Sequence, residues 1–90
     1  MDLNQVDTIY ENLKFILVNK HNDYGPGNIN NAYGGPMNGL LVRIGDKFER
    51  IKNLSKEGKA SNYEPLEDSF RDLANYCVIA LLVMEGKWDK

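Results

Sequence analysis

The chain has 90 residues, of which 42% are hydrophobic and 27% are charged, and its formal net charge at pH 7 is −2. A chain of this length makes one small domain, so we treat residues 1–90 as a single unit. The slightly acidic balance lacks the basic footprint of generic nucleic-acid binding or of binding to a membrane surface.

Helical spacing of apolar residues predicts a first helix from Leu3 to Asn19. A polar cluster at residues 20–23, followed by glycine and proline, marks its end. Residues 22–36 then form a long loop rich in glycine, asparagine and tyrosine. Loops of this length are uncommon in compact domains and are often functional, and the alternative is a solvent-exposed connector.

A second helix is expected from Pro36, which fits the first helical turn, to about Lys56. Gly39 and Gly45 each weaken this helix by about 1 kcal/mol relative to alanine. Glycine at these positions would permit the close approach of either another helix or a ligand. The apolar face of the second helix is formed by Met37, Leu40, Leu41, Ile44, Phe48, Ile51 and Leu54.

A third helix is expected after a polar linker at residues 57–63, with Pro65 in its first turn and its end near Glu85. The stretch 66–84 is apolar on nearly every side, and a helix that is hydrophobic all round is buried. So short a chain forms only a thin core, so we expect a homo-oligomer, a dimer or larger, to cover this helix. Trp88 is expected to fold back onto the bundle.

No segment alternates as strands do, so the predicted fold class is all-α: a small bundle of about three main helices, completed by oligomerisation. The single cysteine, Cys77, is expected in the core and cannot form an internal disulfide, which fits a reducing compartment. The polar start lacks the features of a signal peptide, and the longest apolar run is too short to span a membrane. We therefore expect a cytoplasmic protein.

Three polar residues interrupt the apolar third helix. Asp68, Asp72 and Asn75 are spaced i, i+4, i+7, so they share one face. Buried charges without partners are costly, and a divalent metal is one partner that would offset the cost. The structural alternative is that Asp68 complements the helix N-terminus and that Asp72 pairs with a lysine.

The second helix adds a cluster of charges around one acid. Asp46 follows Arg43 by three residues and precedes Arg50 by four, with Lys47 beside it. One interpretation is a solvated ion-pair face, which contributes little stability. The other is that Asp46 faces the two acids of the third helix, so that three carboxylates bind Mg²⁺ or Mn²⁺. The arginines and Lys47 would then meet phosphate oxygens.

The only histidine, His21, lies with Asp23 and Tyr24 at the end of the first helix. A lone histidine in such a position is more often a helix-end cation than a catalyst. The sequence contains no CxxC, HExxH or P-loop motif that would indicate another chemistry.

Three blocks of sequence carry a resemblance to a known family: KHNDYGPGNI at residues 20–29, GLLVRIGDK at 39–47, and EPLED at 64–68 with DLANY at 72–76. In this order they resemble the small phage and bacterial proteins of the nucleotide modification associated domain 1 family. That family looks like a branch of the MazG-like all-α nucleoside triphosphate pyrophosphatases. The resemblance covers most of the chain, from about residue 15 to residue 88.

MazG-like enzymes hold Mg²⁺ with an ExxE motif on one helix and an ExxD motif on the next, and the metal activates water for attack between the α and β phosphates. The resemblance therefore implies that Asp46, Asp68 and Asp72 bind the metal and are catalytic. This chain departs from both motifs. The second helix offers one carboxylate, and Ser69 is the residue three positions before Asp72.

Two functions follow from the resemblance. The first is a metal-dependent pyrophosphohydrolase of a dNTP or modified nucleotide. The second is a non-catalytic nucleotide-binding protein, such as a phage protein that sequesters a nucleotide signal in the host cytoplasm as an anti-defence sponge. In both, the loop at 23–33 closes over the nucleotide, and the ligand-binding residues are His21, Asp23, Tyr24, Asn28, Arg43, Lys47, Arg50 and Asn75. A third alternative is a helical oligomerisation module, which would neither bind nor hydrolyse nucleotides.

Overall fold

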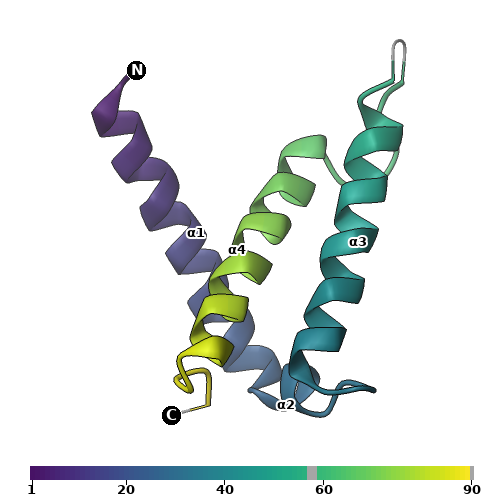
Figure 1. The fold of residues 1–90 in the computed structure, drawn as a ribbon. Helices are drawn as coiled ribbons and strands as arrows, with labels where there is room; N and C mark the ends of the chain where they lie inside the picture. Colours follow the sequence, from purple (N-terminus) through teal and green to yellow (C-terminus); the bar gives the residue numbers. More distant parts are fainter. Residues whose placement is uncertain (57–58, 90) are drawn as a thin grey trace.

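The computed structural model describes residues 1–56 and 59–89, and its regular structure over those residues is entirely helical. The helices are α1 (Leu3–Tyr24), α2 (Gly27–Asn30), α3 (Pro36–Leu54) and α4 (Leu66–Met84). Figure 1 shows α3 and α4 side by side and antiparallel, with α2 at the base and the N-terminal half of α1 standing away from the rest. The prediction of an all-α fold with three main helices is confirmed.

The first helix is longer than the sequence predicted, because it continues from Asn19 to Tyr24. Asp2 caps its start by accepting a hydrogen bond from the backbone N–H of Gln5 at 3.1 Å. Gly25 ends it with φ 68°, a conformation that favours glycine, and donates its N–H to the His21 carbonyl at 2.8 Å. The expected 22–36 loop is accordingly shorter and contains α2.

The other two long helices lie close to their predicted bounds. α3 begins at Pro36 as predicted and ends at Leu54, two residues before the expected end. Pro65 was expected in the first turn of α4, but it is the N-cap residue, and the helix begins at Leu66. The first two residues of the predicted linker, 57–58, lie outside the described residues.

The core lies at the base of the molecule. Ile29 of α2, Leu40 of α3 and Ile79 of α4 are buried together. Leu17 and Trp88 are among the partly buried side chains that pack against them, so the C-terminal segment does fold back onto the bundle. None of the residues Leu3–Tyr24 of α1 is buried.

The two glycines of α3 have different surroundings. A Cβ atom on Gly39 would lie 2.4 Å from the Cβ of Ala32, so this glycine permits the chain before α3 to pack against the helix. At Gly45 a Cβ would meet no described atom within 4 Å. Close approach by another segment of the chain therefore accounts for a glycine at position 39 but not for the glycine at position 45.

Within one chain, α4 is not buried on every side. Ser69, Asn75 and Ile79 are its buried residues. Its outer face carries four exposed large side chains: Phe70, Val78, Leu81 and Met84. Cys77 is exposed, so the expectation of a core cysteine is wrong for the single chain. The reason is that α4 packs against α3 on one flank and α1 on another, which leaves a third face open.

No helix in residues 1–56 and 59–89 combines the length and the apolar character that crossing a membrane requires.

Candidate functional site

A pocket of about 270 Å³ lies next to the core, where the four helices meet the C-terminal segment. Its volume is close to the lower end of the range for small-molecule sites, which is about 300 Å³. It is lined by Leu17, Lys20, His21, Tyr24, Gly25, Asn28, Ile29, Arg43, Asp72, Asn75, Tyr76, Ile79 and Trp88.

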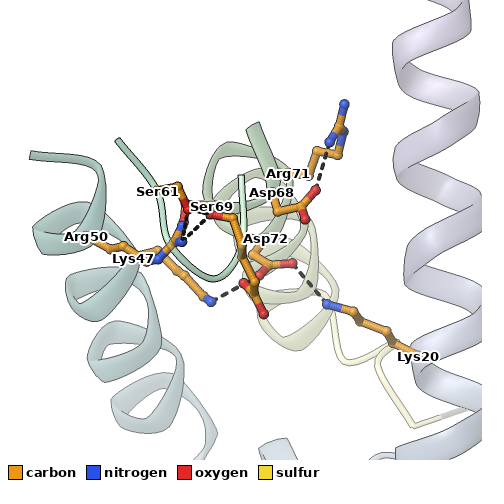
Figure 2. Close-up of polar contacts among 9 residues, drawn as sticks. Lys20, Lys47, Arg50, Ser61, Asp68, Ser69, Arg71 and Asp72 are labelled. Atoms are coloured by element: carbon orange, nitrogen blue, oxygen red, sulfur yellow. Dashed lines mark hydrogen bonds and ion pairs between the residues drawn. The ribbon is translucent and has the colours of Figure 1, made fainter. Parts of the chain in front are cut away.

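Asp72 is the junction of the three long helices. One carboxylate oxygen, Oδ1, lies 3.0 Å from Lys20 Nζ of α1, and the other, Oδ2, lies 3.0 Å from Lys47 Nζ of α3. Figure 2 shows the two ammonium groups reaching Asp72 from opposite sides. Only 14% of the Asp72 side chain is exposed, so this carboxylate is a largely buried charge held between two cations.

The two lysines fix the ionisation state of Asp72. Partial burial disfavours the charged carboxylate, but hydrogen bonds from Lys20 and Lys47, together with their charges, outweigh it. The pKa of Asp72 therefore lies below its ordinary value. Partial burial also opposes the charge of Lys20, and the hydrogen bond and charge of Asp72 outweigh it, so the pKa of Lys20 is raised. Both groups are ionised at neutral pH.

Arg43 connects α3 to the chain around α2. Its Nη2 donates to the Asn28 carbonyl at 2.9 Å. The Nη1 of Arg43 and the Nδ1 of His21 are buried and have no hydrogen-bond partner among the described residues. Buried polar atoms are nearly always paired, so these two nitrogens, on side chains that line the pocket, are exceptions to that rule.

The end of the pocket next to the C-terminal segment is aromatic. The rings of His21 and Trp88 meet edge to face with centroids 4.6 Å apart. The indole N–H of Trp88 donates to the Pro26 carbonyl at 3.4 Å, which holds the C-terminal segment against the start of α2. Tyr24 and Tyr76 line the same pocket.

The predicted polar stripe on α4 is divided between two hollows. Asp72 and Asn75 line the pocket, and the side-chain amide of Asn75 donates to the Leu13 carbonyl of α1 at 3.1 Å. Asp68 lies one turn earlier, pairs with Arg71 at 2.8 Å and lines a second hollow. That hollow shares Lys20 and Asp72 with the pocket and is also lined by Ile16, Glu64 and Arg71.

The three predicted metal ligands do not come together in one chain. Asp46 is exposed and lines neither hollow. Neighbouring residues on a helix point roughly 100° apart, so α3 cannot direct both Lys47 and Asp46 toward Asp72. No group of three or more acidic, histidine or cysteine side chains in the described residues is placed to hold a metal ion. The residues of one chain thus do not fit a three-acid Mg²⁺ or Mn²⁺ site, and a metal stays a prediction.

The remaining predicted ligand residues occupy several places. His21, Tyr24, Asn28 and Arg43 line the pocket, Lys47 reaches it through Asp72, and Asp23 is exposed outside it. Arg50 donates to the Ser69 hydroxyl and to the Glu64 carbonyl, so it fastens the start of α4 to α3 (Figure 2). Ser69 is fully buried beneath it.

Sequence reasoning missed Lys20, Tyr76 and Trp88 as pocket residues. Two of them carried a usable signal, because Lys20 opens the first sequence block and Tyr76 lies one helical turn after Asp72. Nothing in the sequence placed Trp88 beside His21, since that contact depends on how the chain turns after α4.

Fold and site together define a small all-α protein with a cationic, aromatic-lined pocket. The family model described as nucleotide modification associated domain 1 matches residues 20–84, and the chain belongs to this family. The matched segment contains every pocket residue except Leu17 and Trp88. A search of curated proteins and a search of solved structures each gave no match.

Proposed function

We propose that the pocket binds a nucleotide, and the observation that carries this proposal is its charge. Lys20 and Arg43 contribute two positive charges to the lining and Asp72 contributes one negative charge, which leaves +1. Lys47 adds a further positive charge at the other oxygen of Asp72. The whole chain carries −2, so the pocket is a cationic spot on an acidic protein and favours an anionic ligand such as phosphate.

The aromatic side chains of the pocket are evidence that the ligand carries a nucleotide base as well as phosphate. His21, Tyr24, Tyr76 and Trp88 offer ring faces and edges, and stacking on aromatic side chains is a common way for proteins to hold bases. We therefore place the phosphates near Lys20 and Arg43 and the base toward His21 and Trp88.

Asp72 has a defined role in this proposal. Carboxylates repel phosphate, but two lysines neutralise this one and are in turn held in place by it. Lys20 is the more exposed of the two lysines, so it is the one that can exchange Asp72 for a phosphate oxygen. Lys47 then keeps the Asp72 charge paired.

Metal-dependent pyrophosphohydrolysis is the second candidate. The observation in its favour is that Glu64, Asp68 and Asp72 line the second hollow, which adjoins the pocket through Lys20 and Asp72. Oxygen ligands of this kind suit Mg²⁺, which would supply charge neutralisation for phosphates bound next to it. Because the described residues of one chain do not place three acids to hold a metal, binding is the function that the geometry supports better.

The test of binding uses the single tryptophan as a reporter, because Trp88 lines the pocket. Nucleoside mono-, di- and triphosphates and cyclic nucleotides are titrated with and without Mg²⁺, followed by Trp88 fluorescence and calorimetry. Lys20→Met should weaken binding by about tenfold, since a charge-assisted hydrogen bond contributes about 1.5 kcal/mol. Lys14→Met removes an exposed lysine of the same helix outside the pocket and should leave binding unchanged. Equal effects of the two substitutions would contradict the proposed site.

Turnover separates the two candidates. The protein is incubated with a bound nucleotide and Mg²⁺, and both released pyrophosphate and intact nucleotide recovered from the protein are measured. Quantitative recovery of intact nucleotide supports binding without catalysis. Pyrophosphate release that EDTA abolishes supports the hydrolase.

A further inference from the structure

The hairpin of α3 and α4 carries an uncovered apolar stripe on each helix. On α3 the stripe consists of Met37, Leu41 and Phe48, and on α4 it consists of Phe70, Leu81 and Met84. All six side chains are exposed in the single chain. Their spacings, i, i+4, i+11 on α3 and i, i+11, i+14 on α4, keep each set on one side of its helix, as in the seam of a helical bundle.

The two stripes lie on the same side of the hairpin. Counting roughly 100° per residue, the α3 stripe lies about 120–160° around the helix from Arg43, and the α4 stripe lies about 120–180° around from Asp72. Arg43 and Asp72 both line the pocket. Because α3 and α4 are packed side by side (Figure 1), the stripes form one continuous apolar face turned away from the pocket. We call it the hairpin face.

The solvent-accessible surface area of the chain can be compared with the area expected for a compact monomer. The chain exposes 6729 Å². A compact monomer of this mass, 10.3 kDa, would expose about 5,400 Å², so roughly 1,300 Å² is in excess. The radius of gyration, 14.4 Å, likewise exceeds the value of about 12 Å for a compact chain of this length. The N-terminal half of α1, which stands away from the other helices (Figure 1), accounts for part of both excesses. A standard protein–protein interface buries about 800 Å² on each partner, so the excess area is large enough to contain one.

We propose that the hairpin face binds the hairpin face of a second copy, so that two α3–α4 hairpins form a four-helix bundle. A two-fold axis brings the same patch of both chains together, and an apolar stripe is its own complement. The pocket lies on the opposite side of the hairpin, so each copy keeps its pocket open to solvent. This proposal is independent of the proposed nucleotide binding.

The test is the molar mass in solution, measured by sedimentation equilibrium across the micromolar range. The wild-type chain should have twice the mass of 10.3 kDa. Leu81→Glu places a charge in the hairpin face and should give the monomer mass with an unchanged helical circular dichroism spectrum. Val42→Glu is the matched control, because Val42 and Leu81 are both 57% exposed but Val42 lies off the stripe. If Leu81→Glu is unfolded, Leu41→Glu probes the same face from α3.

The lone cysteine gives an independent measurement. Cys77 lies seven residues from both Phe70 and Met84 and is exposed in the single chain, so the proposed dimer would cover it. Its reaction with a maleimide should be slow at high protein concentration and become faster on dilution. A monomeric wild-type protein throughout the concentration range would overturn the proposal. A dimer that Val42→Glu dissociates and Leu81→Glu does not would overturn it as well.

Discussion

Replacing Asp72 by asparagine removes the charge at the junction of the three long helices while keeping the shape of the side chain. The partner Lys47 is 23% exposed, so this charge-assisted contact contributes about 1–1.5 kcal/mol. Lys20 is 55% exposed, and solvent screening reduces its contribution to about 0.2–0.5 kcal/mol. We therefore expect Asp72→Asn to lower the free energy of unfolding by about 1–2 kcal/mol, which for a domain of this size lowers Tm by about 4–15 °C.

The effect of this substitution depends on pH. The pKa of Asp72 is lowered in the folded protein, so its contribution to stability is present above the ordinary carboxyl pKa of about 3.9 and is lost as pH falls through the folded value. Asparagine does not titrate. The stability difference between wild type and Asp72→Asn should therefore be constant from about pH 5 to 8 and shrink below about pH 4. Lys20, whose pKa is raised, loses its contribution only as pH rises above its ordinary value of about 10.4.

The measurement is urea unfolding followed by circular dichroism at a fixed protein concentration, because association would otherwise shift the apparent stability. Asp68→Asn is the control, since the Asp68–Arg71 pair is 42% and 43% exposed and its loss should change stability by less than about 0.5 kcal/mol. A difference that persists unchanged at pH 3, or an equal effect of the two substitutions, would refute the assignment of Asp72 as the buried junction charge.

Three further substitutions test the packing by thermal unfolding. Gly39→Ala should destabilise the protein by about 1–3 kcal/mol, because its Cβ would collide with Ala32, whereas Gly45→Ala should stabilise it by up to about 1 kcal/mol, because its Cβ enters open space. Equal effects of the two would show that the contact with Ala32 is absent. Asn75→Ala should cost about 0.5–1.5 kcal/mol, because the Leu13 carbonyl loses the side-chain donor that ties α4 to α1, and a neutral result would mean that water replaces the amide.

Elements with strong local signals could be predicted from the sequence. Pro36 set the start of α3 because proline fits the first helical turn, and the absence of alternating patterns excluded strands. The sequence predicts too early an end for α1, because polar residues such as His21 and Asp23 are typical of a helix end, whereas the helix continues until Gly25 supplies a positive φ. Polar side chains are compatible with the last turn of a helix, and in α1 the glycine after that turn ends the helix.

Helical spacing alone predicts the candidate site only where its residues share one helix, and the family resemblance adds the pocket residues His21, Tyr24 and Arg43. Asp72 and Asn75 were placed together from their spacing on α4, and both line the pocket. The spacing predicts that Asp72 can pair with a lysine but does not say which one, because Lys20 and Asp72 are 52 residues apart and meet only through the crossing of α1 and α4. The same limit applies to Asp46. The spacing on α3 does not say which side of the helix faces α4, and in the structure Lys47 faces Asp72 while Asp46 is exposed.

The attachment of α1 links the fold to the proposed function. No residue of Leu3–Tyr24 is buried, so apolar packing holds this helix less firmly than α3 and α4 hold each other. Two polar contacts supplement that packing, the ion pair from Lys20 to Asp72 and the hydrogen bond from Asn75 to Leu13. The residues on the α4 side of both contacts line the pocket, and so does Lys20. A ligand that takes Lys20 from Asp72 would act on one of the contacts that orient α1, so the proposed nucleotide binding would be coupled to the position of this helix.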